Sequence, residues 1–276
     1  MKSYENKVAA ITGAGSGIGR ATAILLAEQG CHLALSDVDE KGLEETVRQI
    51  QGVKCTAQRV DVADREAVYQ WADQVVSDHG KVNIIMNNAG VALGDTVEHM
   101  KYEDFEWLMN INFWGVVYGT KAFLPYLKQS GEGHVVNVSS VFGLIGVPTQ
   151  SAYNAAKFAV RGFTESLREE LEIEGSCVAA TSVHPGGIKT NIARNSRVGT
   201  VNSISAKATT VEDAAKQFDK LARTSPREAG KIILDGVKKN KARILVGFDA
   251  HVIDSMQRLL PTAYQKLLIF GAKRVG

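Results

Sequence analysis

The most constraining feature of this sequence is a short apolar run that ends in a glycine-rich turn and continues directly into a helical pattern. The run is Val8–Thr12, and the helical pattern begins near Ile18. Glycines let the backbone turn tightly and approach a pyrophosphate, while a helix start offers unpaired N–H groups and a partial positive charge. A turn of this kind after the first strand predicts a dinucleotide site. The candidate binding residues in the turn are Gly13, Gly15, Ser16, Gly17, Ile18 and Gly19, with glycines in a G-x-x-x-G-x-G spacing.

Strand-like and helical segments alternate along the rest of the chain. Apolar runs without period-two alternation are typical of parallel strands covered on both faces, and segments such as Ala152–Leu171 have helical periodicity. Gly30, Gly80 and Gly175 follow helices, where a left-handed cap is expected. We predict one α/β domain over residues 1–276, with a Rossmann-type doubly wound parallel sheet of about seven strands and helices on both faces. The expected strands include Val8–Thr12, Leu33–Ser36, Ile84–Met86, Val135–Ser139, Val178–Val183 and Ile244–Val246.

Composition argues against several classes of protein. The chain is 45% hydrophobic, and its 32 basic and 30 acidic residues are interspersed, so nothing indicates a nucleic-acid-binding tract. The amino-terminal residues lack a signal-peptide pattern, which predicts a cytoplasmic location. The histidines show no metal-ligand spacing, so we expect no metal site. Cys31, Cys55 and Cys177 form no C-x-x-C pair and lie beside apolar runs, where we expect small core residues.

Asp37 stands at the end of the second predicted strand, about twenty residues beyond the glycine turn. A carboxylate there can accept hydrogen bonds from the adenosine ribose hydroxyls and repels a 2′-phosphate. No basic residue occupies positions 14, 15, 16 or 38 to offset that repulsion. Asp37 therefore favours NAD(H) over NADP(H); the alternative is a solvated helix cap.

Tyr153 and Lys157 lie four residues apart in a helical stretch and share one face of it. A free tyrosine, with a pKa of about 10, is a poor base at neutral pH, and a neighbouring ammonium favours the phenolate. We therefore predict that Lys157 lowers the pKa of Tyr153 and makes it a usable acid and base. A Y-x-x-x-K pair is common by chance, so its surroundings carry the argument.

Polar residues follow two further predicted strands. Asn87-Asn88-Ala89-Gly90 follows Ile84–Met86, and Ser139-Ser140 ends the next strand. Both ends fall at the carboxyl edge of the sheet, where ligands of open α/β folds bind. Asn112 is a polar residue within an otherwise apolar helical stretch.

These residues, in this order, resemble the short-chain dehydrogenase/reductase family, and the resemblance covers nearly the whole chain. Its motifs are the glycine turn, Asp61-Val62, Asn87–Gly90, Asn112, Ser140, Tyr153, Lys157, Pro185-Gly186 and Thr190. The resemblance implies an oxidoreductase that moves a hydride between a nicotinamide dinucleotide and an alcohol or ketone. Oligomers are usual in this family, so it also implies a homodimer or homotetramer, with interfaces on the helices that carry Asn112 and Tyr153.

The resemblance also implies roles for individual residues. Tyr153 would exchange a proton with the substrate oxygen, Ser140 would hydrogen-bond that oxygen, and Lys157 would hold the nicotinamide ribose. Asn112 would anchor a water that links Lys157 to solvent. Ser140 is preferred to Ser139 because the family places its serine thirteen residues before the tyrosine. The cofactor contacts would be Asp61 and Val62 at adenine, Asn88 on the ribose side, and Ile188 with Thr190 at the carboxamide. The other residues expected to bind the cofactor are Ala89, Gly90, Pro185 and Gly186.

Several of these positions also have a structural interpretation. Asn87 and Asn88 could mainly tie neighbouring strands together, and Pro185-Gly186 could simply turn the chain. A Ser/Thr-rich stretch at about 190–215 is expected to be a substrate lid or, alternatively, a solvated insertion. Its arginines, Arg194 and Arg197, are more typical of solvated side chains than of an anion clamp.

Apolar residues flank the predicted catalytic positions, which favours a hydrophobic secondary alcohol or its ketone as the substrate. The stretch Arg258–Pro261 is weakly similar to the tails of family members that act on retinoids, steroids and long-chain alcohols, which favours a bulky substrate. The alternative is a reductase of the carbonyls of such lipids. The amphipathic tail at about 250–276 is too short to span a bilayer. It is expected to cover the substrate entrance or a neighbouring subunit, or else to make peripheral membrane contact. The expected pocket residues are Val91, Leu93, Val141, Phe142, Leu144 and Val147.

Two other classes of function stay open. A non-catalytic dinucleotide-binding scaffold would be expected to show degraded catalytic positions, and none is seen. Epimerisation or dehydration would keep the fold and change the chemistry, as in some relatives.

Overall fold

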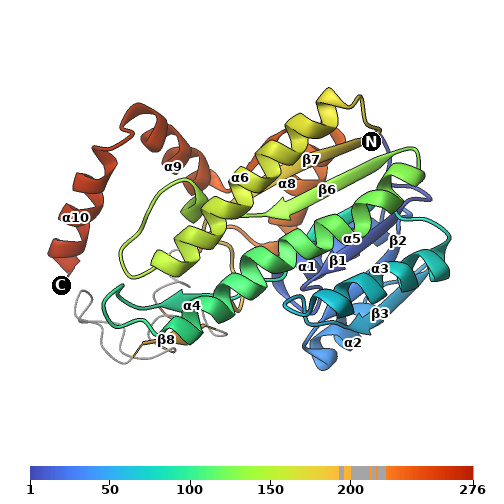
Figure 1. Ribbon diagram of the computed structural model, residues 1–276, viewed down its shortest axis with the longest axis horizontal. Helices are drawn as coiled ribbons and strands as arrows, with labels where there is room; N and C mark the ends of the chain where they lie inside the picture. Colours follow the sequence, from blue (N-terminus) through green and yellow to red (C-terminus); the bar gives the residue numbers. More distant parts are fainter. Residues whose placement is uncertain (193–195, 200–211, 213–215, 217–221, 276) are drawn as a thin grey trace.

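Seven parallel strands form the main sheet of the computed structural model, which describes residues 1–192, 196–199, 212, 216 and 222–275 (Figure 1). Their order is β3-β2-β1-β4-β6-β7-β9, so the direction of winding reverses between β1 and β4. The carboxyl ends of strands on either side of such a reversal leave a crevice for ligands. The predicted Rossmann-type sheet is confirmed, and a two-stranded pair, β5 with β8, lies outside it.

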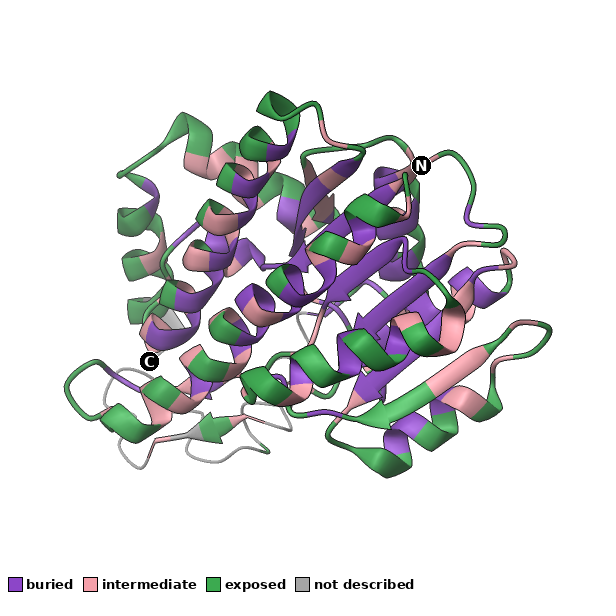
Figure 2. Cartoon of the chain, turned by 45° about the vertical axis from the view of Figure 1, so that its right-hand side comes forward, coloured by how far each residue is buried: buried purple, intermediate pink, exposed green. Residues whose placement is uncertain are grey.

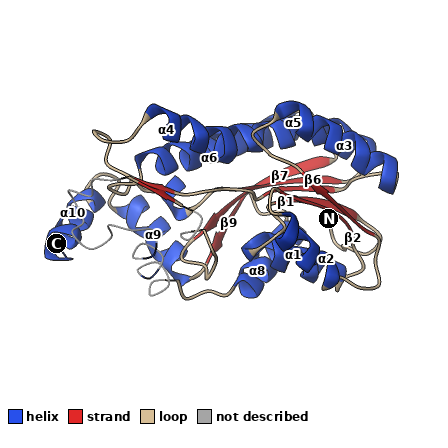
Figure 3. Ribbon diagram, turned by 90° about the horizontal axis from the view of Figure 1, so that it is seen from below, coloured by secondary structure: helices blue, strands red, loops and turns tan. Residues whose placement is uncertain are grey.

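The strands are short and apolar because both faces of the sheet are covered. Along β1, Ala9 and Ile11 belong to the core on one face, whereas Val8 and Ala10 belong to the core on the other. Figure 3 shows α1, α2 and α8 on the first face and α3, α5 and α6 on the second. The strands are Val8–Thr12 (β1), His32–Asp37 (β2), Cys55–Arg59 (β3), Ile84–Asn87 (β4), Leu93–Gly94 (β5), Gly133–Val138 (β6), Val178–Pro185 (β7), Arg197–Val198 (β8) and Arg243–Val246 (β9).

The helices connect these strands and end where the sequence indicates. Gly80 adopts the left-handed conformation (φ 73°) at the end of α3, and Gly175 does so (φ 62°) just after α6, as predicted. The helices are Gly17–Ala27 (α1), Glu40–Arg48 (α2), Arg65–His79 (α3), Tyr102–Met109 (α4), Gly115–Gln129 (α5), Ser151–Ile173 (α6), Pro226–Lys238 (α8), Phe248–Leu259 (α9) and Tyr264–Val275 (α10), with a π-helical turn Asn110–Trp114 (η1) and a 3-10 turn Val141–Gly143 (η2).

Cysteine burial corrects one expectation. Cys31 is buried, but Cys55 is only half-buried and Cys177 is exposed. Cys177 lies before β7, in the connection that follows Gly175, where the chain has not yet entered the sheet. Because its side chain is exposed, Cys177 is a surface residue rather than a core residue, and its thiol lies 3.4 Å from the Lys128 carbonyl.

The expected lid at about 190–215 falls mostly outside the described residues. The described part includes β8, which pairs with β5 and so fixes Arg197 over α4. The expected tail forms two helices, α9 and α10, separated at the stretch that contains Pro261. These helices are largely exposed, in contrast to the buried sheet (Figure 2). None of the helices in the described part of the chain is long and apolar enough to cross a membrane.

Candidate functional site

The glycine turn between β1 and α1 packs closely against two other loops. Gly13 and Gly17 have positive φ angles of 66° and 54°, which side chains rarely adopt. A Cβ atom on Gly13 would lie 2.8 Å from the Ala89 Cα, and one on Gly17 would lie 3.0 Å from the Thr190 Cγ2. The turn, the end of β4 and the loop after β7 therefore meet, as the predicted cofactor residues require.

Thr12 and Asn88 fix the turn to β4. The Asn88 side-chain amide donates to the carbonyls of Thr12 (3.0 Å) and Gly13 (3.1 Å). The Thr12 hydroxyl accepts from the backbone N–H groups of Asn88 (3.0 Å) and Ala89 (3.1 Å). Asn88 thus supports the turn, and so does Thr12, the last residue of the predicted first strand.

Asn87 has the structural role that was one of its two interpretations. Its side-chain amide donates to the Asn137 Oδ1 (2.8 Å) and to the Thr120 hydroxyl (3.1 Å). Asn137 lies opposite Asn87 in the register of β4 and β6. The pair ties two central strands together beneath the site.

Asp37 lies at the outer end of the crevice and holds the turn as well. Its Oδ2 accepts from the Gly15 backbone N–H (2.7 Å), and its Oδ1 accepts from the Asp39 N–H (3.0 Å). Helix α2 has its own cap, Asp39, which accepts from Gly42. The interpretation of Asp37 as the helix cap is therefore wrong, and its carboxylate faces the glycine turn instead.

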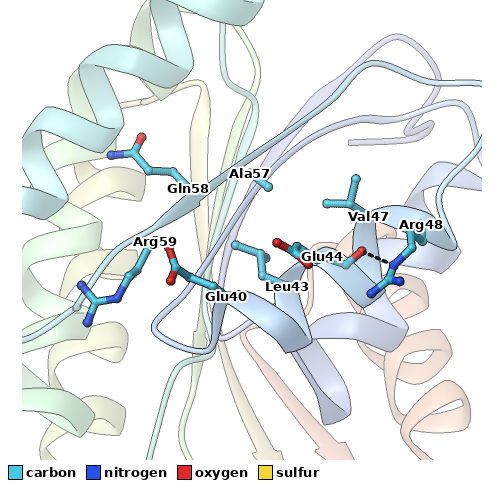
Figure 4. Close-up of a pocket in the computed structure, with 8 residues that line it drawn as sticks. All are labelled: Glu40, Leu43, Glu44, Val47, Arg48, Ala57, Gln58 and Arg59. Carbon is cyan, nitrogen blue, oxygen red and sulfur yellow. Dashed lines mark hydrogen bonds between the residues drawn. The ribbon is translucent and has the colours of Figure 1, made fainter.

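Two arginines near Asp37 escaped the sequence argument. Arg20 donates to the carbonyls of Gly15 and Gly42 and pairs with Glu45 at 3.0 Å, so its charge is engaged. Arg59 is the register partner of Asp37 on β3. It is exposed at a groove of about 540 Å³ between α2 and β3, where Figure 4 shows it beside Glu40.

Asp61 and Val62 follow β3 at this outer end. Asp61 is exposed, and its Oδ1 accepts from the Ala63 N–H (2.9 Å). Val62 is buried, and a Cβ on Gly115 would lie 2.9 Å from its Cγ2. Asp61 is therefore open to a ligand, whereas Val62 mainly packs against the start of α5.

Taken together, this crevice fits a dinucleotide. A Cβ atom would lie 3.0 Å or less from another atom at Gly13, Gly15, Gly17 and Gly19, so the turn has no room for side chains at these positions. The turn leads into the amino terminus of α1, and a carboxylate stands at the end of β2. A helix start that follows a glycine turn is suited to a pyrophosphate, and the carboxylate to ribose hydroxyls.

Tyr153 lies in the first turn of α6, at the inner end of the crevice. It is 9% exposed, and Phe142 contacts its ring edge to face, with centroids 6.0 Å apart. Burial raises the pKa of Tyr153 to about 12, although the facing Ser140 hydroxyl lowers it. The phenol is therefore held in its protonated form, contrary to the expectation that Lys157 lowers this pKa, because removal from water disfavours the phenolate.

Lys157 lies one helical turn further along α6 and is 3% exposed. Its Nζ donates to the Val138 carbonyl (3.0 Å) and lies 5.5 Å from the centre of the Tyr153 ring. Burial lowers the pKa of Lys157 to about 8. The amine is thus fixed beside the phenol and can change charge near neutral pH.

The two serines after β6 make different contacts. The Ser139 hydroxyl donates to the Lys157 carbonyl (2.7 Å) and so ties α6 to the strand end. The Ser140 hydroxyl accepts from the Phe142 N–H (3.1 Å) at the start of η2 and faces the Tyr153 phenol. Ser140 is the serine that a substrate oxygen near Tyr153 would meet.

Asn112 lies inside the π-helical turn η1, a local form often found at functional sites. Its Oδ1 accepts from the Val91 N–H and its Nδ2 donates to the Val91 carbonyl, both at 2.8 Å. A Cβ on Gly90 would lie 3.2 Å from the Asn112 Oδ1 and 3.6 Å from the Lys157 Nζ. Asn112 is therefore beside Lys157, but its side chain mainly anchors the loop after β4.

His184 is a supporting residue that the sequence did not single out. It is fully buried on β7, and its Nδ1 lies 2.9 Å from the Ser140 carbonyl. A carbonyl only accepts, so Nδ1 carries the proton, and Nε2 accepts from the Ser182 hydroxyl (2.9 Å). Burial lowers the pKa of His184 to about 4, so a neutral ring holds the backbone of Ser140.

The loop after β7 forms another wall of the site, beside the glycine turn. The Gly186 N–H donates to the Val246 carbonyl (2.9 Å), and Ile188 bridges to Thr224. Ile188 is buried in the core that also holds α1 and α8, whereas Thr190 contacts Gly17. Of the predicted carboxamide contacts, Thr190 is the one at the crevice, and Ile188 supports the loop.

An apolar cluster surrounds Tyr153. Of the expected pocket residues, Val91, Leu93 and Phe142 pack in this cluster, and Val147 lines a separate cavity against α10. Val141 and Leu144 are buried. Arg197 pairs with Asp104 at 2.7 Å and lies over the Trp107 ring at 3.9 Å, so it is engaged by α4 rather than poised as a clamp.

Comparison with known proteins agrees with this geometry. A family profile described as short chain dehydrogenase matches residues 7–200. The chain belongs to the short-chain dehydrogenase/reductase family. This short-chain dehydrogenase/reductase is 50% identical to "Putative oxidoreductase SadH" of Mycobacterium tuberculosis, over 99% of this chain and 98% of that one.

A second relative is "3-oxoacyl-[acyl-carrier-protein] reductase FabG" of Thermotoga maritima, 36% identical over 67% of this chain and 76% of that one. Among solved structures, a short chain dehydrogenase/reductase from Burkholderia phymatum in complex with NAD superimposes with a TM-score of 0.84. It is 28% identical, and the match covers 97% of this chain and 96% of that one. The chain is thus an oxidoreductase of this family.

Proposed function

We propose that this protein is an NAD(H)-dependent oxidoreductase that interconverts a hydrophobic, bulky secondary alcohol and its ketone. The observation that carries the proposal is the buried group of Tyr153, Ser140 and Lys157 beside a turn fitted to a dinucleotide. The NAD named for the Burkholderia phymatum structure supports the same cofactor class. A carbonyl reductase of retinoid, steroid or long-chain lipid substrates is the alternative.

The residues act on the substrate oxygen. Tyr153 keeps its phenolic proton up to high pH and donates it to the oxygen of a ketone as that oxygen becomes an alkoxide. Ser140, whose backbone is held by His184, hydrogen-bonds the same oxygen and orients it. Lys157, fixed to Val138, stabilises the phenolate left behind. Its amine would also hold a ribose hydroxyl of the cofactor. When bound, the nicotinamide supplies or accepts the hydride.

The preference for NAD(H) follows from Asp37. Its carboxylate stands at the end of β2 against Gly15, where a ribose hydroxyl can donate to it and a 2′-phosphate would be repelled. The pyrophosphate would be held by the glycine turn, at Gly13, Gly15, Ser16, Gly17, Ile18 and Gly19. The rest of the cofactor site would be formed by Asp61, Val62, Asn88, Ala89, Gly90, Pro185, Gly186, Ile188 and Thr190.

The substrate class follows from the surroundings of Tyr153. The cluster that packs on its ring contains Leu93, Phe142 and other apolar residues. Arg197, an arginine of the predicted lid, is paired with Asp104 and is not directed at an anion. A ketone flanked by apolar groups therefore fits this environment better than a phosphorylated or carboxylated one.

We propose one domain that assembles as a homodimer or homotetramer in the cytoplasm. Trp114 and Phe158 are 43% and 41% exposed on the segments that carry Asn112 and Tyr153, where family members associate. Helix α10 of the tail contacts the loop that contains Gly146, because the Gly146 N–H donates to the Tyr264 hydroxyl. This contact supports a place for the tail beside the substrate entrance. Peripheral membrane contact through its exposed side is the alternative.

The test is NADH oxidation by the purified protein with a panel of apolar ketones and aldehydes. Replacing Tyr153 with Phe removes the proton donor and is expected to lower kcat by about 10³-fold with little change in NADH binding. Tyr102→Phe, at a tyrosine that is 85% exposed, is the matched control. Full turnover by Tyr153→Phe would contradict the mechanism, and tight NADH binding without turnover on any substrate would favour a scaffold.

A further inference from the structure

The two C-terminal helices carry two polar side chains that reach back to the loops of the site. Asp249 lies in the first turn of α9 and Tyr264 in the first turn of α10. Neither residue is among those that carry the family resemblance, and their hydrogen bonds are to Gly187 and Gly146 rather than to Tyr153 or Lys157. Their partners are backbone N–H groups of two different loops.

Asp249 holds the loop that follows β7. Its Oδ2 accepts from the Gly187 N–H at 2.6 Å. A Cβ on Gly186 would collide with the same carboxylate, so this loop and α9 are in close contact. The positive φ of Gly247, 97°, brings the chain from β9 into α9 at this point. Gly187 lies in the same loop as Thr190, the predicted carboxamide contact that stands at the crevice.

Tyr264 holds the loop between Ser140 and the catalytic helix. Its hydroxyl accepts from the Gly146 N–H at 3.1 Å. The Tyr264 ring is 7% exposed, although Leu267 and Phe270 on the same helix are more than half exposed. The ring is thus inserted while most of α10 remains at the surface. Beside it, a cavity of about 570 Å³ separates α10 from the loop and includes Val147 and Leu268 in its lining.

The two contacts belong to one unit. Helix α9 also packs against η2, the turn that directly follows Ser140. Only residues 260–263 separate α9 from α10, so the two contacts lie at the starts of neighbouring helices. A backbone N–H donated to a carboxylate is stronger than one donated to a neutral oxygen, so Asp249 is the firmer of the two attachments.

We propose that the C-terminal helix pair is a positioning device in which Asp249 orders the cofactor loop through Gly187 and Tyr264 orders the substrate loop through Gly146. Asp249 and Tyr264 are positioning residues, because they act through these loops and not on the reacting atoms. The inference rests on the proposed function for its kinetic consequences, but the ordering of the two loops can be measured without any substrate.

The first experiment measures amide hydrogen exchange of the full-length protein. Asp249→Ala is expected to speed exchange in peptides that cover 186–190, and Tyr264→Phe in peptides that cover 144–150, each by about tenfold, because the donor loses its acceptor. Asp249→Asn, which keeps a side-chain oxygen, is expected to restore most of the protection. Unchanged exchange in both loops of both variants would overturn the proposal, whatever reaction the protein catalyses.

The second experiment separates the two loops by function. Asp249→Ala is expected to raise the Kd of NADH, measured by fluorescence titration, about tenfold, or ~1.4 kcal/mol, and to leave the KM of the ketone unchanged. Tyr264→Phe is expected to raise the KM of the ketone about fivefold without changing the NADH Kd. Equal effects of both variants on both constants would show only a general loss of stability and would overturn the division of tasks.

Matched controls come from the same helix and from the surface. Asp254→Ala removes a carboxylate of α9 that pairs with Arg243 and Arg258 and does not touch the loop, and Tyr102→Phe removes an exposed hydroxyl. Should Asp249→Ala fail to fold, Asp249→Ser serves in its place, since its side chain is too short to reach Gly187. A wild-type protein that binds NADH but reduces no ketone would contradict the proposed function. The effect of Asp249→Ala on the NADH Kd could still be measured in that case.

Discussion

The inner end of the site, around Tyr153, and the outer end, around Asp37, are built in opposite ways. At the inner end Tyr153, Lys157 and His184 are buried, and burial moves the pKa of each. At the outer end Arg59 and Asp61 are exposed, and Asp37 is half-buried. Charges that face water are screened and contribute little energy each, whereas buried groups lose or gain several kcal/mol when their state changes. The inner end should therefore control rate and stability, and the outer end the choice between cofactors.

Replacing Lys157 is expected to have the largest effect at the inner end of the site. Lys157→Met is expected to lower kcat/KM for ketone reduction by about 10²-fold or more, because the phenolate that forms at Tyr153 loses its cation. Since the pKa of Lys157 is lowered to about 8, its ammonium is present below that pH and lost above it. Wild-type reduction should therefore fall by up to about tenfold per pH unit above pH 8, as measured in a pH–rate profile. Lys121→Met, at an exposed lysine of α5, is the control, and a flat profile from pH 6 to about 9 would contradict the prediction.

His184 tests the inner end through stability. Because burial holds the pKa of His184 at about 4 rather than 6.5, the unfolded chain takes up the proton first as the pH falls below 6.5. Stability is therefore lost between pH 6.5 and about 4. Between pH 7 and pH 5 the wild-type protein should lose about 2 kcal/mol more unfolding free energy than His184→Asn, as measured by urea denaturation. His251→Asn, at an exposed histidine, should behave like the wild-type protein. An equal loss of unfolding free energy in all three proteins would show that a group other than His184 causes the pH dependence.

The difference between the two ends also explains how far the sequence could predict this site. Gly13, Ser140, Tyr153 and Lys157 occupy fixed places relative to strand ends, so the order of elements was enough to bring them together. The direction of the Tyr153 pKa shift could not be predicted, because it depends on how completely the helix and η2 exclude water, and that is a property of packing.

Residues far apart in sequence were missed for a related reason. His184 lies 44 residues from the carbonyl it holds, and Tyr264 lies 118 residues from Gly146. Neither belongs to a local pattern, so only the register of β6 with β7 and the path of the C-terminal helices bring them to their partners. Arg59 was missed because it lies beside Asp37 across the sheet and not along the chain.

Asp37 provides the strongest test at the outer end. Asp37→Ser removes the carboxylate that repels a 2′-phosphate and is expected to raise the ratio of kcat/KM with NADPH to that with NADH at least tenfold, or about 1.4 kcal/mol. The Tyr153-dependent step should be unaffected, so kcat with saturating NADH should change little. Asp39→Ser makes the same change in net charge two residues away and keeps a helix cap, so it should leave the ratio unchanged. An unaltered ratio in Asp37→Ser would show that another group sets the preference.

Replacing Arg59 at the outer end is expected to have the smallest effect, and this effect is on kcat/KM with NADPH. In the Asp37→Ser background, Arg59 is the basic side chain at the same register on the neighbouring strand, so it can attract the phosphate of NADPH. Adding Arg59→Ala should lower kcat/KM with NADPH about threefold and leave NADH unaffected, since an exposed charge contributes well under about 1 kcal/mol. The effect should shrink as the salt concentration rises, because the guanidinium faces water. Arg48→Ala, which removes another arginine from the lining of the same groove, is the control. Equal losses of kcat/KM with NADPH from both substitutions would show that Arg59 acts only through the overall positive charge of this surface and not through its place beside residue 37.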